Sequence, residues 1–355
     1  MKKISYILMT LAVVASCTKT EISYDLPDQI SFAPVAKVST KAAVQGEYPN
    51  LPILVYANAG EGTTFTDSYL DDVQFENTDT DNINAWVNET AYWPNEKSLI
   101  FSGVSKLSNV SANNVSMDFT TGKQLTITGY NQLDSGDNDL MWFPITEPQR
   151  PQSTALSIEM KHACAWLVFN FKGNDVTASS TSPWKVTKVV VKNIYKTGTA
   201  NLGITASWPT ANLSNNVDYV VYNDYPQDAT ATTVVYNENG KGKSLTTSGV
   251  DISNNDNVIV IPQNINETNG LLEITYEFKS QANTIIKEVK TVSLAPTSTD
   301  SAWAAGKKYT YDVIITTQQI MISPTVAGWD QYDAVPDVDG DDATTGIQNP
   351  TQTIS

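Results

Sequence analysis

The sequence predicts an all-β protein made of two tandem antiparallel β-sandwich domains. Apolar residues nowhere recur at the three-and-four spacing of an amphipathic helix over more than two turns. Instead, short runs rich in Val, Ile, Thr, Tyr and Phe are separated roughly every ten residues by Asn, Asp, Gly, Ser and Pro, which is typical of sandwich strands and turns. The chain has 355 residues, of which 41% are hydrophobic, and this is enough for about two domains with cores of their own.

The predicted strands follow one another along the chain, and each is a short run that is apolar or alternates between apolar and polar residues. They cover residues 30–32, 53–57, 99–104, 156–160, 163–169, 186–191, 219–222, 258–261, 272–278, 285–294 and 309–315. A polar, turn-forming stretch over residues 173–183 divides them, so we place the two domains at residues 30–175 and 176–329. Residues 17–29 are expected to form a tether, and residues 330–355 an acidic, polar tail that is flexible or weakly ordered.

The N-terminus has the pattern of a bacterial lipoprotein signal. Lys2 and Lys3 precede an apolar run over residues 4–14 that is too short to span a bilayer as a helix, and small residues stand directly before Cys17. We therefore expect residues 1–16 to be a cleaved signal peptide and Cys17 to be lipidated. The alternative is an ordinary secretory signal followed by a chance cysteine. Because each buried methylene contributes about 0.8 kcal/mol, several acyl chains on one cysteine hold a protein durably on a membrane.

The charge and the composition argue against nucleic acid and anionic lipid surfaces as partners. The formal net charge is −16, and loss of Lys2 and Lys3 with the signal brings it to −18. The sequence contains a single arginine, Arg150, and no cluster of basic residues that would bind phosphate groups. After Cys17 no apolar run is long enough to cross a bilayer, so we expect the rest of the chain to be held by the lipid alone.

The sequence contains no catalytic or cofactor-binding motif, and we predict no enzyme activity, no cofactor and no metal site. Cys164 lies in a strongly apolar run, two residues after His162 on the same predicted strand, so we interpret it as a small buried residue and not as a nucleophile. With Cys17 lipidated, Cys164 also has no disulfide partner within the chain. Residues 337–342 resemble part of a calcium loop, but the glycine comes too early and the closing glutamate is missing. The eight tryptophans stand mostly in apolar contexts, which favours core packing over glycan stacking.

Several local patterns follow one another behind the lipidation signal. They are Ile30-Ser31-Phe32, Ser39-Thr40-Lys41-Ala42, the run 53–57, Ala91-Tyr92-Trp93-Pro94, the run 160–169, the run 303–311 and Val326-Ala327-Gly328-Trp329. In this order they resemble the fimbrillin family of Bacteroides-type bacteria, in its Mfa-like branch of type V pilus subunit lipoproteins. The resemblance runs from about Ile30 to Trp329. Lys41 stands where the family often has Arg, and Cys164 stands where it often has an aliphatic residue or Ala.

The resemblance implies a cell-surface fimbrial (pilus) subunit, tip or accessory protein that supports adhesion. Its two domains would be transthyretin-like β-sandwiches, and it would reach the cell outer membrane as a lipoprotein with palmitate on Cys17. In such subunits a protease removes the first strand, and the opened groove accepts a strand from a neighbouring fimbrial subunit. Carried onto this chain, the removable strand covers about residues 30–39 and the cut separates Lys41 from Ala42. The core of that strand would be formed by Ile30, Phe32, Val35 and Val38.

The residue pattern allows two fates for residues 30–39 and more than one function for the protein. Residues 30–39 are either removed or remain as the ordinary first strand of an uncut sandwich. The tail does not alternate between apolar and polar residues and is rich in Asp, which makes it a poor donor strand and favours a tip, anchor or accessory role. The alternative function is a monomeric outer-membrane surface lipoprotein that binds glycans or host ligands through exposed Trp and Tyr. A hydrolase with paired carboxylates is a third hypothesis, but no such pair is placed by the sequence.

Overall fold

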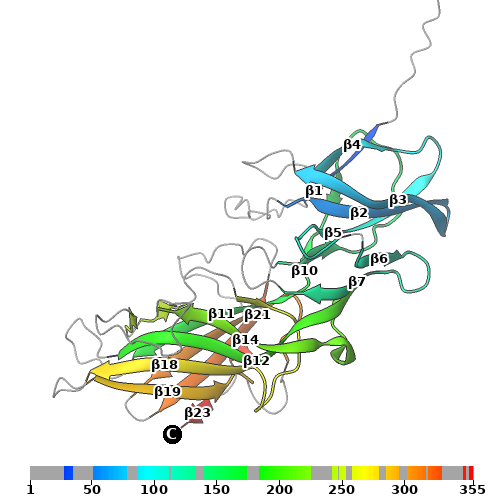
Figure 1. Cartoon of the computed structure of the whole chain (residues 1–355). Coiled ribbons are helices and arrows are strands. Elements are labelled where there is room, and N and C mark those ends of the chain that lie inside the picture. Colours follow the sequence, from blue (N-terminus) through cyan, green and yellow to red (C-terminus); the bar gives the residue numbers. More distant parts are fainter. Residues whose placement is uncertain are drawn as a thin grey trace, which may run out of the picture.

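The computed structural model confirms that the chain is all-β (Figure 1). The only helical element among the described residues is one 3-10 turn, η1 (Thr210–Asn212). The structure describes residues 28–34, 51–77, 86–111, 113–132, 139–173, 184–224, 242–246, 248–252, 258–279, 285–295, 302–316, 319–329, 347–348 and 352–354. Within these ranges no helix is long and apolar enough to cross a membrane.

The N-terminal half is a sandwich whose two layers belong to one folded path of strands. The order along that path is β10-β8-β5-β2-β3-β4-β1-β9. The strands are β1 (Gln29–Pro34), β2 (Ile53–Glu61), β3 (Thr64–Asn77), β4 (Trp86–Tyr92), β5 (Ser98–Ser105), β8 (Met141–Phe143), β9 (Leu156–Ile158) and β10 (Lys161–His162). The long strand β3 pairs with β2 along most of its length and with β4 at its end, so it passes from one layer to the other.

The C-terminal half is a second sandwich of two sheets. One sheet has the order β16-β11-β20-β21-β22 and the other the order β19-β18-β12-β7-β6. The strands of the first sheet are β11 (Ala165–Gly173), β16 (Val250–Asp251), β17 (Val258–Val260), β20 (Lys307–Ile315), β21 (Ile320–Gly328), β22 (Ile347–Gln348) and β23 (Gln352–Ile354). Those of the second are β6 (Val115–Asp118), β7 (Gln124–Asn131), β12 (Trp184–Leu202), β13 (Ala206–Ser207), β14 (Ser214–Asn223), β15 (Lys243–Ser244), β18 (Leu271–Lys279) and β19 (Ile285–Ser293).

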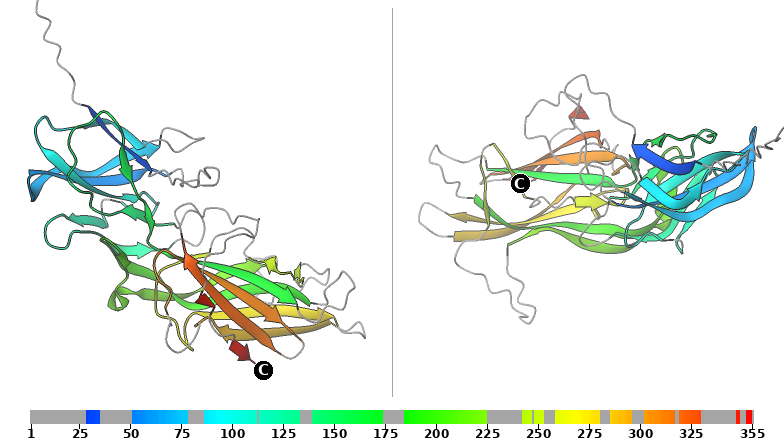
Figure 2. Two further views of the ribbon diagram at one scale, coloured as in Figure 1. Left: turned by 180° about the vertical axis from the view of Figure 1, so that it is seen from behind. Right: turned by 90° about the horizontal axis from the view of Figure 1, so that it is seen from above.

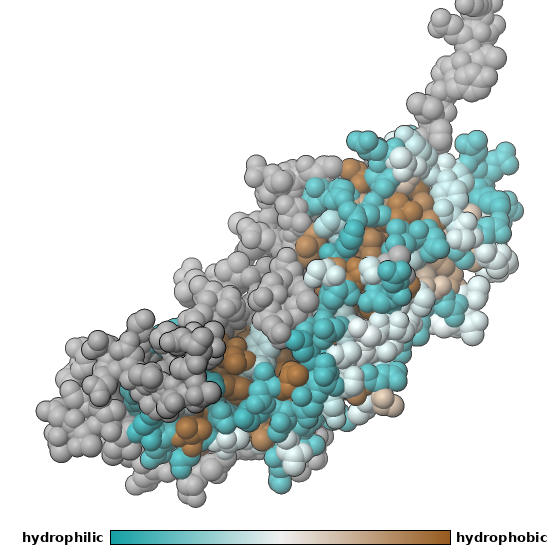
Figure 3. Space-filling model, in the orientation of Figure 1, coloured by the Kyte–Doolittle hydropathy of each residue, from teal (hydrophilic) through white to brown (hydrophobic). Residues whose placement is uncertain are grey.

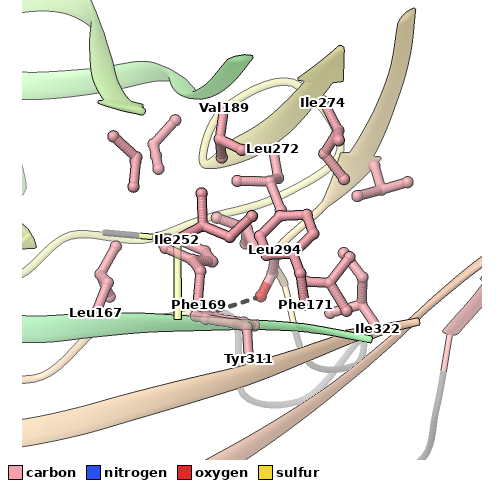
Figure 4. Close-up of a cluster of buried hydrophobic side chains, with 14 of the residues drawn as sticks. Leu167, Phe169, Phe171, Val189, Ile252, Leu272, Ile274, Leu294, Tyr311 and Ile322 are labelled. Carbon is pink, nitrogen blue, oxygen red and sulfur yellow. Dashed lines mark hydrogen bonds between the residues drawn. The ribbon is translucent and has the colours of Figure 1, made fainter. Parts of the chain in front are cut away.

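The core of the C-terminal sandwich is built from the inward residues of these two sheets (Figure 4). Phe169 on β11 stacks against Tyr311 on the neighbouring strand β20, with ring centroids 5.5 Å apart. The Tyr311 hydroxyl donates a hydrogen bond to the Leu294 carbonyl and accepts one from the Trp303 indole. A buried tyrosine is stable in an apolar core only when its hydroxyl is paired in this way.

Strand β12 runs from the C-terminal sandwich to the junction with the N-terminal half, where Ala200 and Leu202 are buried in the shared core. Its first part pairs with β18 in the C-terminal sandwich, and residues 197–202 pair with β7. The layer of β2 and β5 lies next to β7 and contacts a hydrophobic core on each of its two faces. Val55 and Phe101 face the N-terminal core with β1, whereas Tyr56 and Ile100 face a junction core shared with β7 and β12. The alternation of a strand explains how one layer serves both cores.

Strand pairing does not follow the domain boundary that we predicted between residues 175 and 176. Strand β11 precedes that point but pairs in parallel with β20 over its whole length, in the C-terminal sandwich. Strand β10, just before it, pairs with β8 in the N-terminal sandwich. As a division into domains the boundary stays a prediction, and we propose to move it to residues 163–164. Local turn signals mark where strands end, but they do not say which distant strand each one joins.

The end of β21 is held against the N-terminal half. The His162 ring on β10 stacks on Trp329 with ring centroids 3.9 Å apart and 10° between the planes, and its Nδ1 lies 2.9 Å from Asp139 Oδ1. The Trp329 amide donates to the Gly306 carbonyl, and the Gly306 amide donates to the Cys164 carbonyl. The other seven tryptophans are buried, which confirms that they serve in packing.

Trp329→Ala is expected to lower the free energy of unfolding by about 2 kcal/mol, because the stacked indole lies between the two halves and is partly covered. Chemical denaturation measures this change. Ile204→Ala is the matched control, since the Ile204 side chain is 81% exposed and lies near the same junction. Equal stabilities of the two variants would contradict the role assigned to Trp329.

Cys164 provides a chemical probe of the junction core. Its side chain is buried, and burial raises the pKa of its thiol well above the ordinary value. In a chain that begins at Thr18, where it is the single cysteine, iodoacetamide at pH 8 should leave the native protein unmodified and alkylate the protein in guanidinium chloride. Mass spectrometry reads the result, and rapid alkylation of the native protein would show that this core is open to solvent.

Candidate interaction site around strand β1

Strand β1 is a short extended segment whose side chains alternate between the core and the surface. Ile30 and Phe32 are fully buried, whereas Gln29 is exposed. The strand ends at Pro34, which lacks the amide hydrogen that a continued ladder would need. The sequence Gln-Ile-Ser-Phe-Ala-Pro therefore accounts for a strand that presents one apolar face over about two side chains.

Strand β1 lies in the interior of its layer and has a neighbour on each edge (Figure 2, blue strand). On one edge it is antiparallel to β4, with Phe32 opposite Trp86; on the other it is parallel to β9, with Phe32 opposite Leu156. At its start the Trp93 amide donates to the Asp28 carbonyl at 2.9 Å. Loss of β1 would therefore expose unpaired backbone groups on both β4 and β9.

The Phe32 side chain fills a pocket of aromatic rings that come from three other strands. Its ring meets Phe75 of β3 edge-on at 5.1 Å, Phe101 of β5 edge-on at 5.4 Å, and Phe143 of β8 at 5.7 Å. Trp93 packs edge-on against Phe101 at 5.6 Å. Edge-to-face ring pairs contribute about 0.5–1.5 kcal/mol each beyond the burial of their area. Phe32 thus ties β1 to the opposite layer of the sandwich.

The structure brings together two of the predicted site residues, Ile30 and Phe32, in one core. The other predicted residues, Val35, Val38, Lys41, Ala42 and Cys17, lie outside the described residues. No local pattern in the sequence indicates the aromatic pocket or the pairing of β1 with β9. The alternation of residues 156–160 did mark β9 as a strand, but its parallel neighbour lies more than a hundred residues earlier in the chain.

The C-terminal tail differs in part from the expectation of a flexible or weakly ordered segment. Its last residues form two short strands, β22 and β23, which pair antiparallel with β21 and lie along the outer edge of that strand. Figure 1 shows β23 at the lower edge of the C-terminal sandwich, below β19. The acidic residues of the tail stand before these strands, whereas the paired segments carry Ile347 and Ile354 and no acidic residue. The composition of the paired segments is more typical of a short edge strand than the composition of the rest of the tail.

The described residues contain no group of three or more His, Cys, Asp and Glu side chains that could hold a metal ion. Some of their carboxylates form surface ion pairs, such as those of Lys192 with Asp218 and Glu273, both at 3.2 Å. Residues 337–342, which resemble part of a calcium loop, lie outside the described residues.

The surface of the N-terminal half carries a pair of exposed aromatic residues. Tyr69 on β3 and Tyr92 on β4 are 38% and 39% exposed, and the Tyr69 hydroxyl donates to the Tyr92 carbonyl at 2.7 Å. Partial burial raises the pKa of the Tyr69 hydroxyl. On the face seen in Figure 3, apolar residues gather most over the N-terminal half, among polar ones. Among the tryptophans only Trp329 is partly exposed.

Solved structures of other proteins share this fold. A fimbrial protein from Bacteroides vulgatus matches with a TM-score of 0.56 and 16% identity, covering 85% of this chain and 99% of that chain. A putative cell adhesion protein from Bacteroides uniformis matches with a TM-score of 0.53 and 15% identity over the same shares. At these identities the likeness shows the fold alone. A search of curated protein sequences finds no match.

The sequence itself matches a family model. The model, described as fimbrillin-like, aligns with residues 40–329, which is most of the chain. The match begins just after β1 and ends at Trp329, the residue that stacks on His162. The chain therefore belongs to the fimbrillin-like family, as the order of its local patterns indicated.

Proposed function

We propose that this protein is a fimbrial subunit, tip or accessory protein of the cell surface that assembles by strand exchange after removal of β1 and supports adhesion. Membership of the fimbrillin-like family supports the fimbrial role and a surface location. The observation that carries the exchange step is the position of β1. It is the first strand described in the chain, it lies between two neighbours in the interior of a layer, and it closes the core with two side chains.

A single cut after β1 breaks its covalent link to the strands that follow, because β1 is joined to β2 through one connection only, residues 35–50. Lys41 and Ala42 stand in that connection, and a lysine-selective protease would produce a chain that begins at Ala42. The family match starts at residue 40, so almost the whole matched span would survive the cut. The lipid on Cys17 would leave together with β1.

The opened groove would be a strong template for a strand from a neighbouring subunit. Burial of side chains the size of Ile30 and Phe32 contributes roughly 1.5–3 kcal/mol each, before ordering costs. The backbone of an incoming strand would in addition restore the ladders with β4 and β9. This is strand addition in a place where an apolar pocket selects the side chains.

The second candidate function is a monomeric outer-membrane lipoprotein that binds glycans or host ligands without any cut. The observation that favours it is the exposed pair of Tyr69 and Tyr92, since sugars stack on exposed aromatic rings. Glycan-array binding by the uncut protein that is lost in Tyr69→Ala and Tyr92→Ala would support this function. Binding that is unchanged in both variants would exclude these residues as its site.

Strand exchange can be measured with a full chain that carries a site-specific protease sequence inserted after Lys41. After cutting, a labelled synthetic peptide of residues 28–41 should enter the protein and displace the original fragment. A peptide with Phe32→Ala should bind at least about a hundredfold more weakly, because a buried Phe→Ala change costs about 3–5 kcal/mol. Fluorescence anisotropy measures both affinities.

The matched control is a peptide with Ser31→Ala, which changes a side chain outside the aromatic pocket and should bind like the original peptide. A peptide of residues 318–326 is a useful competitor. Its Gln319-Ile320-Met321-Ile322-Ser323-Pro324 has the Gln, Ile and Pro of β1 at the same positions, with Ile322 in place of Phe32 and Met321 in place of Ser31. If no peptide enters the cut protein, strand exchange at β1 is wrong.

A further inference from the structure

We propose that the segment carrying β9 is a strap that forms the movable second wall of the β1 groove and closes along whichever strand occupies it. The inference rests on the proposed strand exchange and adds to it a part of the chain that must move. The strap is residues 150–160, and its ends are fixed on the layer of β5 and β8.

The two ends of the strap are held by backbone hydrogen bonds to that layer. Before the strap, the Gln149 amide donates to the Leu99 carbonyl at 2.7 Å and the Leu99 amide donates to the Gln149 carbonyl at 2.9 Å. After it, Lys161 and His162 of β10 pair with β8. Between these anchors the chain crosses to the other layer of the sandwich, lies beside β1 as β9, and returns.

Among the described strands, β9 has β1 as its one ladder partner. It stands at the end of the strand order, and its three residues pair with Phe32, Ala33 and Pro34. Strand β4, on the other side of the groove, pairs with β3 as well as with β1. Emptying the groove would therefore leave β4 its two described pairs with β3, at Trp86 and Val87, but remove the whole described ladder of β9.

The side chains of β9 also depend on β1. Leu156 and Ile158 are 5% and 3% exposed and lie in the same core as Ile30 and Phe32, whereas Ser157 points outward. Before β9, residues 150–155 are mostly exposed and contribute no residue to that core; after it, Met160 at the end of the strap is buried there. A three-residue strand held by two apolar side chains and one ladder has low local stability once its ladder is gone.

The β1 groove, with β4 and β9 as its two walls, determines which kind of partner can bind there. It is an extended segment with large apolar side chains at two alternate positions, the second of them aromatic, to match Ile30 and Phe32. Such a segment pairs first with β4, whose place is kept by β3, and the strap then closes on its other edge. Closure adds a second ladder and buries Leu156 and Ile158 again, so it slows the release of the bound strand.

Hydrogen exchange measured by mass spectrometry tests the strap in the unsubstituted full chain with the protease site after Lys41. Three states are compared: uncut, cut and stripped of the β1 fragment through an N-terminal affinity tag, and stripped and refilled with the peptide of residues 28–41. We expect amides of residues 156–158 to exchange at least about tenfold faster in the stripped state than in the other two. Residues 98–105 of β5 and 271–279 of β18 should not change. Equal protection of residues 156–158 in all three states would overturn the strap.

A pair of variants tests whether closure retains the bound strand. The double substitution Leu156→Ser and Ile158→Ser should release the labelled peptide at least about tenfold faster than the unsubstituted chain, because β9 loses both of its core side chains. Ser157→Ala, on the outward face of the same strand, is the matched control and should leave the release rate unchanged. Unchanged release from the double variant would also overturn the strap. If the peptide enters the groove but residues 156–158 do not respond, the strap is wrong while strand exchange stands; if no peptide enters, both are wrong.

Discussion

The insertion of Phe32 among Phe75, Phe101 and Phe143 is the contact on which the N-terminal sandwich depends. Phe32 belongs to the first strand described in the chain, while its three neighbours come from strands of the sandwich that follow later. The packing of this core depends on the side chains of β1 and not on the covalent link to that strand. In the exchange that we propose, a strand of another chain with similar side chains would take its place. Strand addition of this kind is the assembly step that we propose.

The contacts in the rest of the molecule do not involve β1, so the proposed exchange would leave them unchanged. Strand β12 runs through the C-terminal sandwich and on to β7, and the layer of β2 and β5 has a core on both faces. One of these cores, with Tyr56 and Ile100, contains no residue of β1. The stack of His162 on Trp329 holds the end of β21 to the N-terminal half independently of β1. Emptying the groove therefore opens one core and leaves the others closed.

Much of the fold could be predicted from the residue pattern, because strand periodicity and turn residues are local signals. The runs 53–57, 99–104 and 163–169 were correctly predicted as strands. The strands β3 and β4 were missed, since Asp, Ser, Glu and Asn interrupt their apolar positions. Strand β12 was predicted over 186–191 only, because its second part is polar and continues through a bulge at Asn193 with φ of 57°. Of the candidate site, Ile30 and Phe32 could be named, but the parallel pairings of β1 with β9 and of β11 with β20 depend on contacts between distant segments that no local pattern encodes.

The most direct test of the central claim is a structure of the protein in filaments taken from cells, combined with N-terminal sequencing of the same material. The account predicts subunits that begin at Ala42, with a strand from a neighbouring subunit lying between β4 and β9 and an aromatic or large aliphatic side chain in the pocket of Phe75, Phe101 and Phe143. Filaments in which every subunit retains its own Ile30 and Phe32 in that place would contradict it.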